Sequence, residues 1–215
     1  MSQLPLTGDE TSGAVALIPE RPTLKSLRAA AAGCTACPLH ANATQTVFGE
    51  GLKRARLMLV GEQPGDREDI EGHPFVGPAG RILDEALDKA GIERADAYVT
   101  NVVKHFKWTP KGKRRIHQAP RAEEIKACAP WLEAELDVVD PQLMVCLGAT
   151  AVRAMIGSKA RVMKDHGELW ESKLGRTAMP TLHPSAILRA DPEDRDDAMA
   201  MLVGDLGVAR RHLEA

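Results

Sequence analysis

The sequence predicts an α/β fold, a three-layer α/β/α sandwich with a central, mainly parallel four-stranded sheet. Two observations lead to this prediction: short apolar runs that are typical of buried strands, and amphipathic segments between them that are typical of helices. The four runs are RLMLVG (56–61), AYVTNVV (97–103), QLMVCLG (142–148) and TAMPTLH (177–183). Because each run is apolar almost throughout, helices should cover both faces of the sheet.

The segments between these runs have helical patterns. In residues 77–92, Ile82, Leu83, Ala86 and Leu87 form a single apolar stripe. The first expected helix closes at a glycine, which is a typical helix end. The expected helices cover residues 23–33, 77–92, 120–139, 148–157 and 192–213.

Composition indicates an ordinary globular protein. The chain has 215 residues, 44% of them hydrophobic and 27% charged, which suits one domain. Residues 1–21 are rich in Gly, Thr, Pro and acids, so we expect a loose N-terminal arm followed by a single domain over residues 22–215. The net charge of −2 gives no general attraction to nucleic acid, so a basic surface must be local.

Targeting signals are missing from the sequence pattern. No apolar run approaches the length of about 18 residues that a membrane helix needs, and the start lacks the pattern of a signal peptide. We therefore expect a cytoplasmic protein without a membrane partner, and a monomer by default. In the cytoplasm, four cysteines are more often metal ligands or free thiols than disulfides.

Three unusual clusters follow the predicted strands. GEQPG (61–65) follows the first strand, Asn101 and a basic segment end the second, and HPS (183–185) follows the fourth. Each alone is typical of a turn. Parallel sheets bind ligands beyond the carboxyl ends of their strands, so the three clusters together predict a site at one edge.

The segment KHFKWTPKGKRRIH (104–117) holds six Lys or Arg, two His, two aromatics and no acid. Such a run is usually a solvated loop. Cations neutralise phosphates and aromatic rings stack on bases, so its concentration in a slightly acidic chain favours nucleic acid. The residues expected to contact DNA are Lys104, Lys111, Lys113, Arg114 and Arg115.

The cysteines form one close pair and two single positions. Cys34 and Cys37 are a C-x2-C pair, Cys128 lies in the long predicted helix, and Cys146 lies in the third strand. A zinc ribbon needs a second close pair, and a thioredoxin motif follows a strand rather than a helix. The spacing suits an iron–sulfur cube, but zinc and free thiols remain open, because a lone cysteine in an apolar element is often simply core.

Several motifs, in order, resemble the iron–sulfur uracil-DNA glycosylases over roughly residues 24–210. The matching segments are GEQPGDREDIEGHPFVGPAGRILDEAL (61–87), TNVVKHF (100–106), LGATA (147–151), LHPS (182–185) and the C-x2-C…C-x17-C arrangement. The resemblance implies a [4Fe-4S] cluster on Cys34, Cys37, Cys128 and Cys146. It also implies uracil-containing DNA, single- or double-stranded, as the partner, and hence a nucleoid-associated location.

Within this family the sequence is most similar to the UdgX-type branch. Gln63 stands where the ordinary branch usually has alanine, and Lys113–His117 form the KRRIH insertion that the ordinary branch lacks. The resemblance implies that the protein excises uracil and then stays bonded to the abasic sugar through His117.

Chemistry assigns roles to the site residues. An amide both donates and accepts, so Asn101 can read the O4 and N3–H edge of uracil, and Phe75 can stack on a flipped base. His183 can donate to uracil O2 as negative charge develops. His117 is the expected nucleophile at C1′, with Glu62 orienting it. The remaining expected substrate contacts are Gly61, Gln63, Gly65, Asp66 and Ser185.

Two other functions fit the same residues. The protein could be an ordinary glycosylase that activates water and turns over, or a non-catalytic iron–sulfur sensor that only binds nucleic acid. A covalent protein–DNA product separates the first alternative from the expected function, and release of free uracil excludes the second.

Overall fold

The computed structural model describes residues 13–215, which pack around one six-stranded sheet with the strand order β1-β3-β2-β6-β8-β7. Its four central strands are parallel and coincide with the four apolar runs. They are β2 (Leu57–Gly61), β3 (Ala97–Asn101), β6 (Leu143–Leu147) and β8 (Thr177–Thr181). The predicted α/β fold with a mainly parallel sheet is confirmed.

The sheet is wider than the four strands predicted. β1 (Glu50–Gly51) pairs antiparallel with β3, and β7 (Trp170–Glu171) pairs antiparallel with β8. Each edge strand has two residues, too few to produce an alternating pattern in the sequence.

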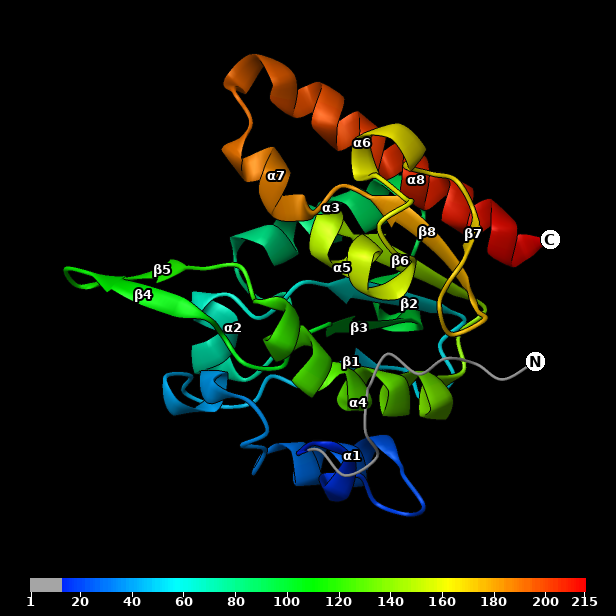
Figure 1. The fold of residues 1–215 in the computed structure, drawn as a ribbon. Coiled ribbons are helices and arrows are strands. Elements are labelled where there is room, and N and C mark those ends of the chain that lie inside the picture. Colours follow the sequence, from blue (N-terminus) through cyan, green and yellow to red (C-terminus); the bar gives the residue numbers. More distant parts are fainter. Residues whose placement is uncertain (1–12) are drawn as a thin grey trace.

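Helices cover the two faces of the sheet as separate layers (Figure 1). α3 and α8 pack with Leu57 and Leu59 on one face, and α1, α4 and α5 pack with Met58 and Val60 on the other. This alternation follows from the period of two along a strand. These helices are α1 (Leu24–Ala31), α3 (Pro78–Ala90), α4 (Ala122–Val139), α5 (Gly148–Met155) and α8 (Arg195–Glu214).

The strand order puts a topological switch point beside β2. The chain crosses from β2 to β3 on one side through α3, and from β3 to β6 on the other side through α4. Crevices at such switch points, outside the carboxyl ends of the strands, are where open α/β sheets bind ligands. The fold therefore directs attention to Gly61 and the residues that follow it.

The basic segment forms a hairpin rather than a loop. β4 (Trp108–Lys111) and β5 (Arg114–His117) pair antiparallel, and Gly112 provides the left-handed residue of the turn, with φ +60°. Figure 1 shows this hairpin projecting from the body of the molecule, on the same side as α7 (Pro184–Arg189). Its final residue is His117, so the hairpin sets the position of that side chain.

Short helices connect the larger elements. They are α2 (Asp66–Glu71), α6 (Val162–Asp165) and the 3-10 turns Val15–Leu17, Pro38–Ala41, Arg94–Asp96 and Pro192–Asp194. No helix among residues 13–215 is both long and apolar enough to span a membrane.

The predicted N-terminal arm is described only from residue 13 onward. Residues 1–12 of the predicted arm lie outside the described residues. Ala14 is 1% exposed and belongs to the core beneath α1, and the turn Val15–Leu17 follows it. The prediction of a loose arm up to residue 21 is therefore wrong at Ala14, because its methyl group is buried in the core.

Candidate active site

The carboxyl ends of β2 and β3 bring three predicted residues together. Gly61 pairs with Asn101 in the parallel register. A Cβ at Gly61 would lie 2.3 Å from Asn101 Oδ1 and 2.7 Å from Phe75 Cζ. Glycine is therefore required here, since any side chain would overlap the two groups expected to hold a base.

Asn101 has the properties of a binding group. Its side chain is 3% exposed, and Oδ1 has no hydrogen-bond partner in residues 13–215. Leaving a buried acceptor unpaired costs about 1–3 kcal/mol. This unpaired oxygen lies at the switch point of the sheet, where open α/β sheets bind ligands. The position indicates that Asn101 Oδ1 binds a ligand.

Phe75 is buried beside Asn101 in an unusual backbone conformation. Its φ of +56° is rare for a bulky residue and is a form of strain that collects at ligand sites. Gly80, at the start of α3, lies so close to Phe75 that a Cβ there would be 1.8 Å from the Phe75 carbonyl oxygen. This close contact between the two backbones holds Phe75 in place. The Phe75 ring centroid is 6.0 Å from that of His183.

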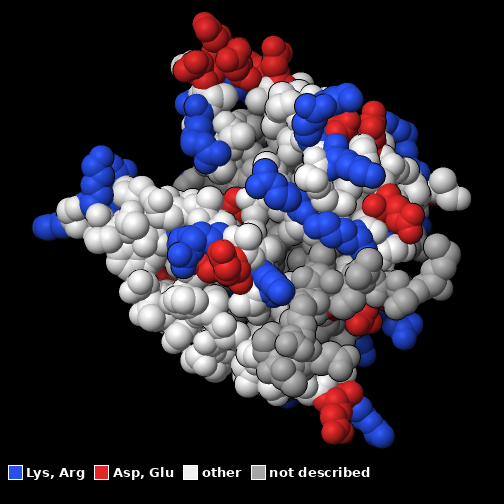
Figure 2. Space-filling view, viewed as in Figure 1, with Lys and Arg blue, Asp and Glu red and all other residues white. Residues whose placement is uncertain are grey.

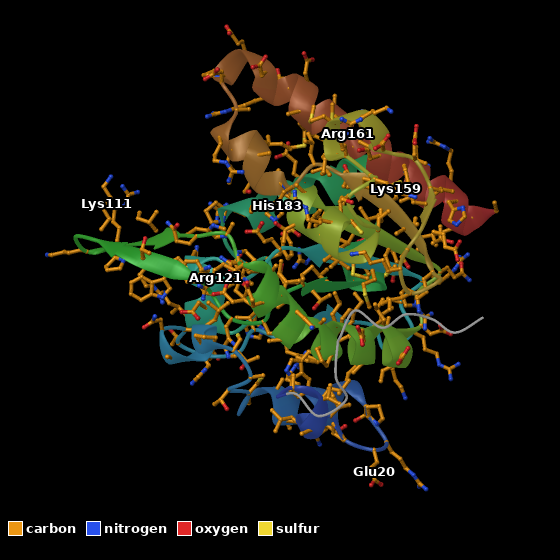
Figure 3. The ribbon with its side chains drawn as sticks, viewed as in Figure 1. Glu20, Lys111, Arg121, Lys159, Arg161 and His183 are labelled. Carbon is orange, nitrogen blue, oxygen red and sulfur yellow. The ribbon has the colours of Figure 1, made fainter. Side chains whose placement is uncertain are left out.

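His183 lies where β8 meets α7 (Figure 3) and is held as one tautomer. Its Nδ1 accepts the backbone N–H of Ser185 at 3.1 Å and lies 2.7 Å from Ser185 Oγ. Burial first, then the positive charges of Arg189 and His117, lower the pKa of His183 to about 4. The imidazole is therefore neutral near pH 7, with its proton on Nε2 as a donor.

His117 meets Glu62 across the site. His117 Nε2 lies 3.4 Å from Glu62 Oε1, and Thr150 Oγ1 donates to Glu62 Oε2. Partial burial lowers the pKa of His117, the Glu62 carboxylate opposes this shift, and Arg189 reinforces it. His117 is thus a largely neutral imidazole next to the Glu62 carboxylate, which Thr150 holds in place. Such a pair suits a nucleophile and the group that orients it.

Two contributors to the site were missed from the sequence. Thr150 lies in the segment LGATA at the start of α5, and a hydroxyl directly after β6 at this edge was a usable signal. Arg189 is an exposed cation at the end of α7, and it contacts Ser185 Oγ at 3.0 Å. Nothing in the local sequence distinguishes Arg189 from any other surface arginine.

Gln63 holds the hairpin instead of facing the substrate. Its Nε2 donates to the carbonyl oxygens of Gln118 at 3.0 Å and Lys107 at 3.3 Å, and its Oε1 accepts the Lys107 N–H at 3.2 Å. The prediction that Gln63 contacts uracil disagrees with this geometry, because the amide is already bonded to both ends of the hairpin.

Arg115 and Asp66 also serve the hairpin. Arg115 Nε lies 2.5 Å from Asp66 Oδ1, and its Nη1 lies 2.6 Å from Asp69 Oδ2. The guanidinium also lies 5.5 Å from the ring centroids of Phe106 and Trp108. The predicted phosphate contact of Arg115 and substrate contact of Asp66 are corrected, since the two side chains pair with each other. Gly65, also a predicted contact, caps α2 beside them.

The remaining predicted DNA contacts divide into two groups. Lys111, Lys113 and Arg114 are exposed at the hairpin tip, where Figure 2 shows blue side chains on the projecting arm and an indentation between this arm and the rest of the surface. Lys104 is 1% exposed, and its Nζ lies 2.5 Å from Glu135 Oε2. The prediction that Lys104 contacts DNA is wrong, because the side chain points into the core.

The resemblance implies an iron–sulfur cluster, and three cysteines are placed for one. Cys34, Cys37 and Cys128 are buried; burial raises the pKa of Cys128 to about 12, and the charges of the other two contribute. Cys146 lies fully buried in β6, where burial alone raises its pKa to about 12. Interactions between cysteines therefore join Cys34, Cys37 and Cys128 and do not include Cys146, so the structure supports only three members of the predicted four-cysteine set.

A single-ion site is a different arrangement. In the described part of the chain, no three His, Cys, Asp or Glu side chains form a group that could hold one metal ion. The ligands of a cube bind different irons and do not converge on one point.

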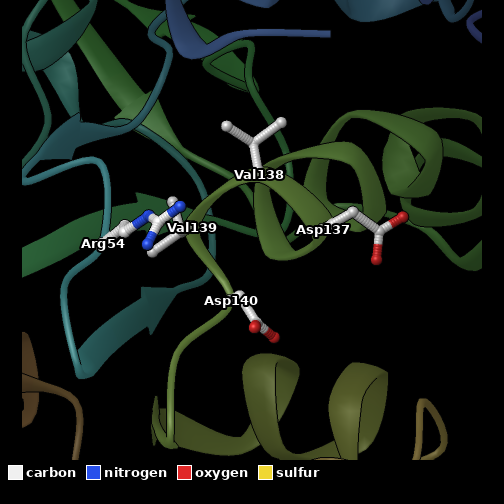
Figure 4. Close-up of a pocket in the computed structure, with 5 residues that line it drawn as sticks. All are labelled: Arg54, Asp137, Val138, Val139 and Asp140. Atoms are coloured by element: carbon white, nitrogen blue, oxygen red, sulfur yellow. The ribbon is translucent and has the colours of Figure 1, made fainter. Parts of the chain in front are cut away.

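A separate pocket lies at the opposite end of the sheet. Arg54, Asp137, Val138, Val139 and Asp140 line it, where α4 ends ahead of β6 (Figure 4). Asp137 and Asp140 pair there with Arg176.

Fold and site together define a class of protein. Residues 48–207 match the family model of the uracil DNA glycosylase superfamily, and the chain belongs to this superfamily. It is similar to the type-4 uracil-DNA glycosylase of Thermotoga maritima, 43% identical over 157 residues that cover 73% of this chain and 78% of the relative. The type-4 uracil-DNA glycosylase of Pyrobaculum aerophilum is 36% identical over 173 residues, which cover 77% of this chain and 85% of the relative.

Proposed function

We propose that this protein excises uracil from DNA and that His117 then bonds covalently to C1′ of the abasic deoxyribose. The observation that carries the proposal is the approach of His117 Nε2 to Glu62 Oε1, at 3.4 Å, at the edge of the sheet where Asn101 and Phe75 meet over Gly61. Membership of the uracil-DNA glycosylase superfamily supports the excision, and the geometry of the hairpin supports the covalent step.

Recognition uses the unpaired amide oxygen of Asn101. A uracil stacked on Phe75 would present N3–H to Asn101 Oδ1 and O4 to its Nδ2, whereas cytosine has the opposite donor and acceptor pattern at these atoms. The base must leave the helical stack to reach a buried amide, as in other enzymes that act on bases.

Bond cleavage sends the electron pair of the C1′–N1 bond to uracil. The Nε2–H of His183 donates to O2, where the negative charge collects, and the neutral state of His183 makes it a donor with no ionic charge. The positive charge that develops on the sugar lies next to the Glu62 carboxylate.

The covalent step follows from the chemistry of imidazole. The unprotonated ring nitrogen of His117 forms the bond to C1′, and the proton on its other nitrogen is lost, so that the overall exchange releases neutral uracil. The product is a nitrogen glycoside, a poorer leaving group than the glycosyl ester of a retaining glycosidase. We therefore expect a persistent adduct.

A denaturing gel tests the proposal. Single-stranded DNA with one uracil, incubated with the protein, should give a band of protein plus DNA that resists heat and detergent. His117→Ala should lose the band. Free abasic DNA without such a band would instead identify an enzyme that activates water and turns over.

A matched control is Lys113→Ala, which changes an exposed cation of the same hairpin and should retain the band. Free uracil in the supernatant, measured separately, reports the excision step. Its absence would contradict the glycosylase activity itself.

A further inference from the structure

We propose that the exposed cations of α5 and α6 bind the phosphates of the DNA strand on the side of the uracil that faces away from the hairpin. The strand is the one whose uracil enters the site, so this assignment rests on the proposed function. The cations, called here the α5–α6 surface, are Arg153, Lys159, Arg161 and Lys164.

The α5–α6 surface is a local excess of positive charge. Residues 148–164 contain these four cations and no Asp or Glu, although the whole chain has a net charge of −2. All four side chains are exposed, and none has an ion-pair or hydrogen-bond partner within residues 13–215. Phosphates are the anions that such unpaired cations neutralise in nucleic acids.

The backbone that carries these cations is firmly attached to the body of the protein. The buried carboxylate of Asp165 accepts the Arg161 backbone N–H at 2.7 Å, and His166 Nδ1 lies 2.9 Å from Asp205 Oδ1 of α8. Lys173 Nζ donates to two carbonyl oxygens at the end of α5, at 2.7 and 3.0 Å. A surface that is ordered before binding loses less conformational entropy when a ligand binds.

The α5–α6 surface begins at the active site. Thr150 of α5 donates to Glu62, and a Cβ at Gly148 would lie 2.8 Å from His183 Cβ. In Figure 3, His183 lies between Lys111 of the hairpin and Lys159 of the α5–α6 surface. Figure 2 shows blue side chains gathered over α5 and α6. A strand with one base in the site must leave it in two directions, and cations are present in both.

Acidic residues disfavour a third direction. The turn Pro192–Asp194 and the start of α8 follow α7 and form the red group at the top of Figure 2. Their exposed acids are Asp191, Glu193, Asp194, Asp196 and Asp197. Like charges repel a phosphate backbone, so the charge distribution directs the strand across α5 and α6 instead.

Two apolar side chains lie among or beside the cations in the sequence. Met163 is 67% exposed and Leu169 is 47% exposed. An acidic protein segment with an apolar side chain would also suit such a surface. DNA is favoured because the α5–α6 surface starts at the residues that hold Glu62, where the substrate strand has to pass.

The salt dependence of binding to single-stranded DNA without uracil tests the surface. The triple variant Lys159→Ala, Arg161→Ala, Lys164→Ala should bind more weakly, and its slope of log affinity against log salt should be smaller by about 2, because each phosphate contact contributes about 0.7. Lys159→Arg, Arg161→Lys, Lys164→Arg keeps the charges and should keep the slope.

A matched control removes three exposed cations elsewhere: Lys25→Ala, Lys53→Ala, Arg54→Ala. Two of these residues precede β2, at the end of the sheet opposite the site, so the slope should stay at the wild-type value. A wild-type slope in the α5–α6 triple variant would overturn the proposal and assign the surface to another anion, such as an acidic protein segment. An equal loss in the control would also overturn it.

Oligonucleotides with the uracil near one end test the direction of the strand. Each such substrate has a long flank on the 5′ side or on the 3′ side alone. Under single-turnover conditions below saturation, the α5–α6 triple variant should slow uracil release from only one of the two. Lys111→Ala, Lys113→Ala, Arg114→Ala at the hairpin tip should slow release from the other.

Equal slowing of both substrates by the α5–α6 triple variant would contradict the assignment of this surface to one flank. The two proposals fail separately. A chain that releases no uracil from any substrate, but whose triple variant shows the smaller slope, would refute the glycosylase step and retain the α5–α6 surface as a DNA-binding surface.

Discussion

At the level of single residues, burial lowers the pKa of both histidines of the site, and their contacts suit them to different tasks. His183 is fixed by the Ser185 N–H at Nδ1, which leaves Nε2–H as a donor for the leaving base. His117 faces Glu62, whose carboxylate can stabilise the imidazolium formed during attack. Their contacts, rather than their residue type, distinguish donor from nucleophile.

The pH dependence of adduct formation should follow His117. Protonation removes the attacking lone pair, and the pKa of His117 lies below the ordinary value of 6.5. The initial rate should therefore persist as the pH falls through 6.5 and decline only at lower pH. Rates measured from about pH 4 to pH 8 check this expectation, and a half-maximal rate at or above pH 6.5 would contradict it.

Asn101→Ala should separate activity from stability. Excision should fall by at least about 100-fold, equivalent to about 2.7 kcal/mol, because uracil loses both hydrogen bonds. The free energy of unfolding should stay the same or rise, since the variant removes a buried oxygen without a partner. Single-turnover excision and urea unfolding, measured on one preparation, test both parts; a large loss of stability would refute the role of Asn101 as a reserved ligand group.

At the level of elements, the hairpin β4–β5 is an arm that positions His117. Gln63 bonds both of its ends, and Arg115 attaches it to α2 through Asp66 and Asp69. The basic residues at its tip remain exposed and are suited to phosphates. The hairpin is thus anchored to the body of the protein through Gln63 and Arg115, and its cationic tip is exposed.

Arg115→Ala should weaken the covalent step more than uracil release. Loss of its charge-assisted hydrogen bonds costs about 2 kcal/mol, so the anchored form of the hairpin should be depleted roughly 30-fold. The ratio of adduct to free uracil, measured in the same reaction, should fall accordingly. Lys113→Ala should leave that ratio unchanged and lower the salt dependence of DNA binding by about one ion; equal ratios in the two variants would argue against the anchor.

The sequence predicted the four central strands because fully apolar runs leave few alternatives, and it placed Asn101 and His183 at one edge because parallel strands end together. It did not predict the hairpin, since a run of cations looks the same in a strand and in a solvated loop. It also assigned Arg115 to phosphate, because the acids that hold it lie more than forty residues away in the sequence.

At the level of the whole molecule, a buried polar network lies beneath the site. Glu135 of α4 accepts from Gly49 N, Tyr98 Oη, Thr100 Oγ1 and Lys104 Nζ. Lys104 Nζ also donates to the Asn101 carbonyl oxygen at 2.8 Å. The network therefore ties α4 and β3 to the residue expected to read uracil. Local sequence could not reveal it, because Lys104 differs from Lys111 and Lys113, the exposed lysines of the same segment, only in burial.

Lys104→Met should behave as a core substitution. Removing one member of a buried ion pair leaves Glu135 uncompensated and costs about 3–5 kcal/mol. Lys113→Ala should change stability by less than about 0.5 kcal/mol. Urea unfolding checks both values. A stable Lys104→Met protein with weakened DNA binding would restore the original prediction that Lys104 contacts phosphate.

Peptide mapping of the covalent product tests the central claim most directly. After reaction with uracil-containing DNA, nuclease trimming and trypsin digestion, mass spectrometry should find the deoxyribose adduct on the peptide Ile116–Arg121, with fragment ions that place it on His117. A sugar adduct on any other peptide, or complete release of uracil with no modified peptide, would contradict the account.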